Sequence, residues 1–392
     1  MTKNVRIGRL AGIVTLATMM VVTSAYADVR VPSIFGGNMV LQRDQENPIW
    51  GWAEPGEKVI VKVGDQQHET TAGDDGAWRV TLQPMSVGEP RSIVIEGKNR
   101  LEFNDVLVGE VWLCSGQSNM QWSVSQSNNA DLETLTANFP NIRLISVPRV
   151  GTQEEQDDFQ GEWRQCSTET VGDFSAVGYF FGRQLHQSLG VPIGLIDNSW
   201  GGSACEAWVR RDLLQADEAY GPLLERWAAE EAKYEELSAA EPENDQQKKA
   251  LQNLKQRMTG QHRPGNLYCG VLNPIIGYGI RGAIWYQGES NASRAYQYRD
   301  LFPLMIKSWR EEWKQGDFPF YWVQLADFKN EVQQPGDSDW AELREAQTMT
   351  MDRLPNTGEA VIIDIGEGRD IHPRNKQDVA LRLARWALAN EY

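Results

Sequence analysis

The stretch Gly109-Glu110-Val111-Trp112-Leu113-Cys114-Ser115-Gly116-Gln117-Ser118-Asn119-Met120 decides the fold. Residues 111–115 form an apolar run ending in a small residue, which is typical of a buried strand in a parallel sheet. The next four residues supply a turn at which a helix begins. Ser118 is therefore predicted to stand at a strand-to-helix corner, where helix N–H groups stabilise developing negative charge. The alternative is that Ser118 only caps the helix.

Further strand patterns follow this stretch and alternate with helical sequence. They are expected at residues 191–198, 280–286, 320–325 and 360–364, with a helix at 174–189 and a last helix at 376–390. Such alternation predicts an α/β fold, a doubly wound parallel sheet with helices on both faces. Ligands of these sheets bind beyond the carboxyl ends of the strands.

The N-terminus has the pattern of a secretory signal. Residues 1–27 contain three basic residues, a short apolar run and the small-residue ending Ala25-Tyr26-Ala27. This predicts cleavage before Asp28 and a periplasmic or secreted protein with no membrane contact afterwards. The alternative is an uncleaved N-terminal anchor.

The mature chain is expected to have two parts. Residues 28–105 show short alternating runs separated by turn signals, which predict a small β-sandwich domain. It could bind sugar, but a structural cap on the next domain is favoured. Residues 106–392 are predicted to form the α/β domain, with a charged helical insertion at about 210–263. No chemistry is assigned to this insertion, and oligomer contact is its minority interpretation.

Charge and cysteine usage exclude several classes of protein. The net charge is −16, which argues against nucleic acid and anionic membranes as partners. Attraction to an acidic sugar would have to come from local arginines, of which Arg281, Arg294, Arg369 and Arg374 are candidates. The cysteine and histidine spacing suggests no metal. Among Cys114, Cys166, Cys205 and Cys269, a Cys205–Cys269 disulfide is the expected pairing in an oxidising compartment.

Three segments each follow a predicted strand and are expected to meet at one edge of the sheet: 198–203, 287–291 and 370–373. A serine, adjacent glycines, a side-chain amide and a histidine preceded by an acid are the components of acyl transfer. Ser118 would attack a carbonyl carbon. His372 would accept the proton of Ser118 and deliver it to the leaving alcohol, while Asp370 would orient the imidazole.

The oxyanion of that reaction also has candidate donors. They are the N–H of Ser118, an N–H at Gly201 or Gly202, and the amide of Gln287. Glycine suits this position because no side chain blocks the approach of substrate to backbone. Simpler roles exist: the glycines could form only a turn, Gln287 could bond only to loop backbone, and His372 could be merely solvated. Their joint occurrence, each after a strand, favours catalysis.

At these residues a family resemblance becomes plain. The opening stretch, with Trp-Tyr-Gln-Gly-Glu-Ser-Asn at 285–291 and Asp-Ile-His-Pro-Arg-Asn-Lys at 370–376, resembles the sialate O-acetylesterase family of the SGNH hydrolases. In that pattern Ser118 matches the nucleophile, the Gly201-Gly202 pair the second block and His372 the last block. Gln287 stands where many SGNH enzymes have asparagine.

Two features depart from the SGNH pattern. The usual acid lies three residues before the histidine, where this chain has Arg369, and Asp370 is only two before. Asp370, a backbone carbonyl or a carboxylate from elsewhere could therefore orient the ring. Members of the family also often continue into a further β-rich segment. Glu289, in the third motif, is interpreted as a structural carboxylate.

The resemblance implies an exported serine esterase that removes O-acetyl groups from sugars without metal or cofactor. Acetylated sialic acid is the expected substrate, and acetylated xylan or another polysaccharide is the alternative. Trp122, Trp200 and Tyr286 lie beside the catalytic segments and could stack on sugar rings. A carbohydrate-binding protein without catalysis is a second alternative, and a structural surface protein a weaker third. The sequence does not indicate the oligomeric state.

Overall fold

The computed structural model describes residues 28–239, 242 and 244–392. The predicted secretory signal, residues 1–27, lies outside the described residues. In the part of the chain that is described, no helix is both long enough and apolar enough to cross a bilayer.

A parallel sheet forms the centre of the molecule, in the order β13-β12-β11-β7-β10-β8, and β9 pairs antiparallel with β8 at one edge. The strands are β7 (Arg100–Gly116), β8 (Phe139–Ser146), β9 (Arg164–Cys166), β10 (Ile193–Asp197), β11 (Gly282–Tyr286), β12 (Phe320–Val323) and β13 (Thr357–Ala360). The opening stretch of the sequence thus lies mostly in β7, with β10 and β11 as its neighbours.

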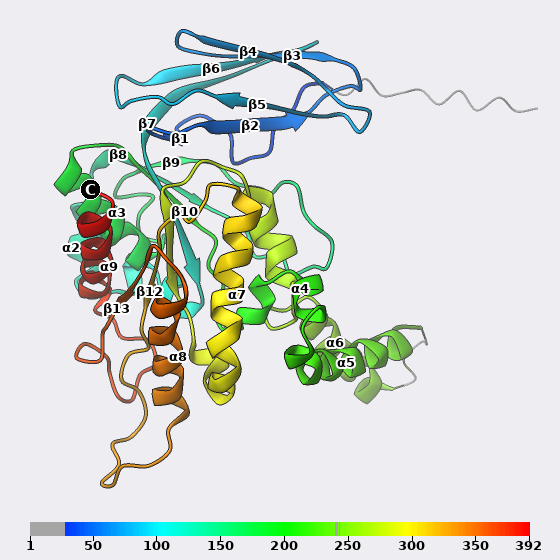
Figure 1. Ribbon diagram of the computed structural model, residues 1–392, viewed down its shortest axis with the longest axis vertical. Helices are drawn as coiled ribbons and strands as arrows, with labels where there is room; N and C mark the ends of the chain where they lie inside the picture. The colour runs from blue at the N-terminus through cyan, green and yellow to red at the C-terminus, as the bar shows by residue number, and fades with distance from the viewer. Residues whose placement is uncertain (1–27, 240–241, 243) are drawn as a thin grey trace, which may run out of the picture.

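Helices cover both faces of this sheet, as Figure 1 shows. The helices are α3 (Ala176–Leu189), α9 (Lys376–Asn390), α7 (Ala295–Trp313) and α8 (Asp339–Arg353). Trp112 and Cys114 share a buried cluster with residues of α3 and α9. Val111 and Leu113 share the other cluster with residues of α7 and α8. This alternation along β7 is the pattern of a strand buried on both faces, and it confirms the prediction of helices on both sides.

The N-terminal strands stack over the amino ends of the parallel strands (Figure 1). They are β1 (Val40–Gln42), β2 (Asn47–Trp52), β3 (Lys58–Val63), β4 (Gln66–Thr71), β5 (Ala77–Leu82) and β6 (Arg91–Glu96). β3 pairs with β4 and β6, β6 pairs with the first part of β7, and β2 pairs with β5. The expected domain boundary after residue 105 falls inside β7, which runs unbroken from one part to the other. A separate β-sandwich domain stays a prediction.

A helical hairpin extends from the body of the molecule (Figure 1). It consists of α5 (Gly221–Ala239) and α6 (Asp245–Met258), and the short α4 (Arg211–Gln215) precedes it. Leu223, Trp227 and Met258 form a small buried cluster between the two helices. The two helices of the hairpin are therefore packed against each other by apolar contacts of their own.

One strand prediction needs correction. The last strand is β13, Thr357–Ala360, and not residues 360–364. Val361 and Ile363 are 42% and 51% exposed, so the apolar run that suggested a strand turns outward. The strand instead includes Gly358, where an added Cβ would lie 2.4 Å from the ring of Trp386. Strand β8 was not predicted, because only its second half is buried.

The expected disulfide is also wrong. Cys114, Cys166, Cys205 and Cys269 are all free thiols. The Sγ atom of Cys205 lies 3.7 Å from Sδ of Met305 in the core, so its nearest sulfur partner is a thioether. Burial raises the pKa of the Cys205 thiol well above its ordinary value, which keeps it protonated and unreactive.

Candidate active site

Ser118, the predicted nucleophile, stands on a tight turn at the carboxyl end of β7. Gly116 has a φ of +135°, and a Cβ added there would lie 2.2 Å from the carbonyl oxygen of Tyr286. Only glycine fits this close approach between neighbouring strands. The short helix α1 (Ser118–Gln121) follows, with Gln117 at its N-cap. Ser118 is thus the first helical residue, so the capping alternative for it is wrong.

Ser118 and His372 are joined by a direct hydrogen bond. The distance from Nε2 of His372 to Oγ of Ser118 is 2.8 Å. The indole of Trp122 stacks on the imidazole, with ring centroids 4.8 Å apart and planes 16° from parallel. Both Ser118 and His372 are half-buried, so neither residue is enclosed in the core. The structure therefore forms a nucleophile–base pair of the kind that acyl transfer needs.

Asp370 lies beside the imidazole but does not hold it by a hydrogen bond. Its Oδ1 accepts the backbone N–H of His372 at 2.9 Å, and the same oxygen is 3.9 Å from Nδ1 of the ring. That separation is too long for a hydrogen bond. The two-residue spacing explains this geometry, because Asp370 closes a turn onto the backbone of His372. Asp370 acts on the ring through its charge, and the stack on Trp122 fixes the ring plane.

Two backbone N–H groups beside the nucleophile have no hydrogen-bond partner among the described residues, those of Ser118 and Gly202. The N–H of Gly201 donates instead to Oε1 of Gln121 at 2.6 Å. A Cβ added at Gly201 would lie 3.5 Å from Cβ of Ser118, so the glycine segment directly borders the nucleophile. Of the two glycines, Gly202 is the one with a free donor, and its φ is +72°.

The Gln287 amide does not match its predicted role. Its side chain is fully buried, and its Nε2 donates to the carbonyl of Ser203 at 3.1 Å and to Oδ1 of Asn291 at 2.7 Å. Its Oε1 accepts the hydroxyl of Tyr298 at 2.9 Å. Because both amide protons are used, Gln287 is placed as a support for the loop after β11 and not as an oxyanion donor.

Sequence reasoning interpreted Glu289 as a structural carboxylate but missed the buried polar network next to Ser118 and His372 to which Glu289 belongs. Asn119 donates from Nδ2 to Oε1 of Glu289 at 2.6 Å and to the carbonyl of Ile371 at 2.9 Å. Its Oδ1 accepts from Nζ of Lys376 at 2.6 Å. Asn119 follows the nucleophile and Ile371 precedes His372, so this side chain ties the two catalytic segments together. The only available signal was that Asn119, Glu289 and Lys376 fall inside the three motifs.

The electrostatics of this network act on the base. Burial lowers the pKa of Lys376 to about 7 and raises the pKa of Glu289. The pKa of His372 is lowered, first by burial and then by the positive charge of Lys376, while Asp370 opposes this. A lowered pKa keeps the imidazole neutral, and a neutral imidazole is the form that accepts a proton.

The aromatic residues and arginines predicted to contact the sugar are only partly available to do so. Tyr286 is fully buried and cannot stack on a sugar, whereas Trp122 and Trp200 are half-buried. Arg281 pairs with Glu110 at 2.8 Å and precedes β11, so it lies at the opposite end of the strand from the dyad. Arg294 pairs with the buried Glu206 at 2.7 Å. The side chains of residues 28–239, 242 and 244–392 include no group of three or more His, Cys, Asp or Glu that could hold a metal.

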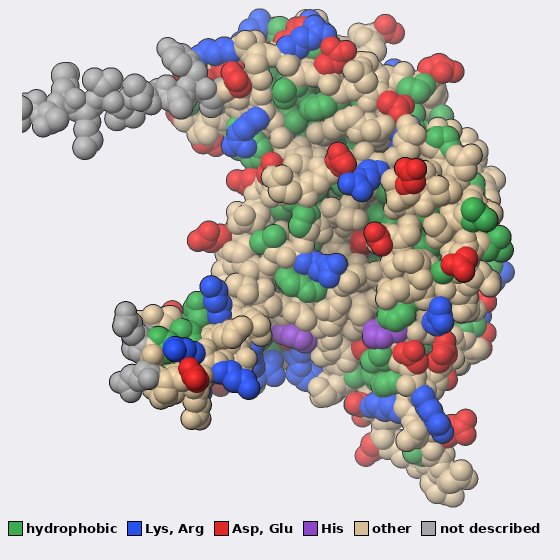
Figure 2. Space-filling model, turned by 180° about the vertical axis from the view of Figure 1, so that it is seen from behind, with side chains coloured by type: hydrophobic (Ala, Val, Ile, Leu, Met, Phe, Trp, Pro, Cys, Tyr) green, Lys and Arg blue, Asp and Glu red, His purple; other side chains and the backbone are tan. Residues whose placement is uncertain are grey.

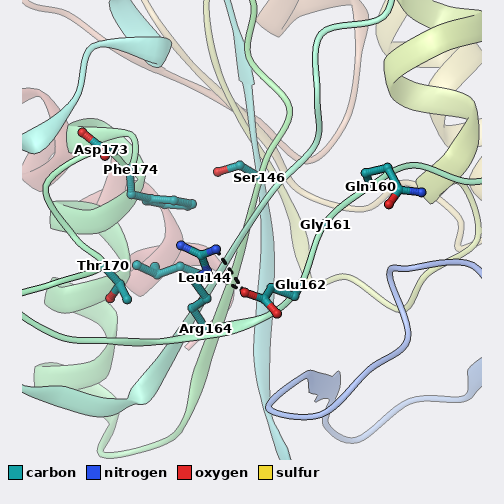
Figure 3. A pocket seen from close by; sticks show the side chains of 9 residues that line it. All are labelled: Leu144, Ser146, Gln160, Gly161, Glu162, Arg164, Thr170, Asp173 and Phe174. Carbon is teal, nitrogen blue, oxygen red and sulfur yellow. Dashed lines mark hydrogen bonds and ion pairs between the residues drawn. The ribbon is translucent and has the colours of Figure 1, made fainter.

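Among the cavities of the described residues, one at the edge of the sheet lies away from the predicted site residues. It has a volume of about 510 Å³ and lies at the carboxyl end of β8, where Ser146 and Phe174 line it. Figure 3 shows the ion pair between Arg164 and Glu162 at its wall. None of the predicted site residues lines this cavity.

Comparison with known proteins shows the family of the chain. Residues 108–260 and 266–381 match the family described as "Carbohydrate esterase, sialic acid-specific acetylesterase". The chain is 34% identical to sialate O-acetylesterase of Mus musculus, over 98% of this chain and 77% of that protein. It is 31% identical to the Homo sapiens sialate O-acetylesterase, over 98% and 75%.

A solved structure extends the agreement to the fold. A carbohydrate acetylesterase from Xanthomonas citri superposes with a TM-score of 0.76 at 37% identity, over 92% of this chain and 74% of that one. The matches run across the nucleophile turn, the glycine segment and the histidine loop. This chain therefore belongs to the sialic acid-specific acetylesterase family of carbohydrate esterases.

Proposed function

We propose that this protein is a serine esterase that removes O-acetyl groups from sugars through an acyl-serine intermediate. The hydrogen bond of 2.8 Å between Ser118 and His372 is the observation that carries the proposal. It joins a serine hydroxyl to a base whose pKa is lowered. Family membership supplies the ester class.

The reaction follows from the placement of these groups. Oγ of Ser118 attacks the acetyl carbonyl carbon while Nε2 of His372 takes its proton. The N–H groups of Ser118 and Gly202 face the negative charge on the carbonyl oxygen, and each such donor is worth on the order of 100-fold in rate. The bond to the sugar oxygen then breaks, and His372 gives its proton to that oxygen. Water attacks the acetyl-serine by the reverse route, which releases acetate.

We propose acetylated sialic acid as the substrate, because the mammalian relatives are named sialate O-acetylesterases. The alternative is an acetylated polysaccharide such as xylan. The Xanthomonas citri relative is described only as a carbohydrate acetylesterase. This broader description is the reason to retain the polysaccharide as the alternative substrate. We also propose that the protein is exported to the periplasm or secreted, on the pattern of residues 1–27.

The experiment is acetate release from O-acetylated sialic acid, acetylated xylan and an aryl acetate, with wild type and Ser118→Ala. We expect wild type to release acetate and Ser118→Ala to lose about three orders of magnitude or more. The preferred sugar in this panel decides between the two substrates. A wild-type protein that binds sugar but releases no acetate, even from the aryl ester, would instead support the non-catalytic binding protein.

A further inference from the structure

A second pocket of about 540 Å³ opens where the helical hairpin joins the body of the molecule. Its walls come from α5, from α6 and the turn after it, and from the loop that follows β11. Its lining includes the basic residues Arg226, Arg257, Arg294 and His262, and no Asp or Glu of the described part of the chain lines it. On a chain of net charge −16, a pocket lined only by basic charged groups is a departure from the general surface. Figure 2 shows Lys and Arg side chains gathered at the base of the hairpin.

The pocket borders the catalytic glycines. Oγ of Ser290, which lines it, donates to the carbonyl of Gly202 at 2.9 Å. Nε2 of Gln261, also in the lining, would lie 3.3 Å from a Cβ added at Gly202. Gly201 in turn borders Ser118. The lining of the pocket and Ser118 thus border the same glycine segment, the lining at Gly202 and Ser118 at Gly201.

The arginines of the pocket differ in whether they already form an ion pair with a carboxylate of this chain. Arg294 pairs with Glu206 at 2.7 Å, and Arg257 pairs with Glu230. Arg226 is exposed and forms no hydrogen bond or ion pair with another described residue. The arginines also act together on His262, because Arg294, Arg226 and Arg257 each lower its pKa in addition to burial, while Glu206 opposes them. One guanidinium is therefore free to bind an anion.

We propose that this pocket binds the carboxylate of a sugar acid whose O-acetyl group lies at Ser118, with Arg226 as the main contact. The inference rests on the proposed esterase function and adds the class of substrate. A guanidinium can hold a carboxylate by two parallel hydrogen bonds, which gives orientation as well as affinity. Ser290 and Gln261 supply neutral donors beside it.

The geometry also gives the helical insertion a role. Sialic acids carry the carboxylate on the ring and acetylated hydroxyls on the glycerol side chain, so the two groups occupy separate sites. Glucuronic acid on an acetylated xylan presents the same carboxylate chemistry. The hairpin, which supplies Arg226 and Arg257, is thereby a determinant of substrate choice.

The test compares Arg226→Ala with a matched control, Lys233→Ala, and with the variant of a competing candidate arginine, Arg369→Ala. Lys233→Ala removes an exposed charge from the same helix outside the pocket, and Arg369→Ala removes the exposed cation three residues before His372. Substrates are O-acetylated sialic acid, acetylated glucuronoxylan, neutral acetylated xylan and an aryl acetate. We expect Arg226→Ala to lower kcat/KM for an acidic sugar about 10- to 100-fold, mainly through KM. Activity on the aryl acetate should stay within about twofold, as for the control variant Lys233→Ala.

If Arg226→Ala lowers kcat/KM for O-acetylated sialic acid, the carboxylate is that of a sialic acid. If it lowers kcat/KM for acetylated glucuronoxylan, the carboxylate is that of glucuronic acid. The proposal is overturned if Arg226→Ala leaves both acidic substrates unaffected, if it lowers neutral and acidic substrates equally, or if only Arg369→Ala has the effect. A wild type inactive on every ester would contradict the proposed function and not this pocket. Calorimetric binding of unacetylated N-acetylneuraminic acid and glucuronic acid to Ser118→Ala, with and without Arg226→Ala, therefore tests the pocket independently of catalysis. Binding to Ser118→Ala that is lost when Arg226→Ala is added supports the proposed carboxylate site. Equal binding to both proteins, or binding to neither, contradicts it.

Discussion

Nζ of Lys376 donates to Oδ1 of Asn119 at 2.6 Å, and Asn119 is the residue that follows Ser118. The Nδ2 of Asn119 also holds the carbonyl of Ile371, the residue before His372. A single buried side chain therefore sets the position of the serine relative to the histidine, and Lys376 adds a charge to the same network. The relative position of Ser118 and His372 and the pKa of His372 therefore both depend on the contacts of Asn119 and Lys376.

Lys376→Met is expected to move the acid limb of the pH–rate profile to higher pH. His372 must be neutral to act as a base, and the positive charge of Lys376 helps to lower its pKa. The pKa of Lys376 is about 7, so below neutral pH the wild-type lysine is charged and opposes protonation of the imidazole. Removing this charge raises the pKa of His372. The measurement is kcat/KM against pH, with Lys233→Met as control. An unchanged or more acidic limb contradicts the prediction.

Asp370→Asn should move the same limb in the opposite direction, because the charge of Asp370 raises the pKa of His372. The loss in kcat should be about tenfold or less, against about 10⁴-fold where the acid bonds to the imidazole. The reason is the separation of 3.9 Å between Oδ1 and Nδ1. Asparagine keeps an Oδ1 acceptor for the backbone N–H of His372, so folding is unaffected. A loss of about 10⁴-fold would show that Asp370 closes onto the ring during catalysis.

Gln287→Met is expected to act on stability more than on chemistry. The substitution removes the hydrogen bonds of the amide, so its buried partners lose theirs. Each buried group left without a partner lowers the free energy of unfolding by about 1–3 kcal/mol. Denaturant unfolding measures this loss, and kcat on an aryl acetate should fall less than tenfold. An oxyanion donor would behave differently, with kcat reduced about 100- to 1000-fold at unchanged stability.

The four cysteines should titrate as four free thiols after denaturation without reductant, since all are free in the structure. The thermal midpoint should accordingly be the same with and without a reducing agent. A midpoint that falls on reduction, or fewer than four reactive thiols, would show that a disulfide forms in the exported protein.

The local signals in the sequence predicted the parts of the site that depend on local conformation. The strand and turn around Ser118, the glycine segment and the histidine loop are each encoded within about ten residues, and parallel strands necessarily bring their carboxyl ends together. The expectation that Ser118 and His372 meet at one edge of the sheet followed from that rule.

The remaining features depend on contacts between distant segments. Gln287 turned inward because Tyr298 and Asn291 of its own loop and helix take up its amide. Arg226 and His262 reach one pocket only through the fold of the hairpin. The last strand begins earlier than its apolar run because Gly358 must pass beneath Trp386. Periodicity cannot show such pairings, since each needs a partner remote in sequence.

The most direct test of the central claim is a double-mutant comparison of Ser118→Ala, His372→Ala and the two together, by the rate of acetate release from an aryl acetate. If the two residues act as one nucleophile–base unit, each single variant should lose about 10³-fold or more, and the double variant should be no slower than the worse single one. A Ser118→Ala variant that keeps its rate within tenfold of wild type, or losses that multiply in the double variant, would contradict the account.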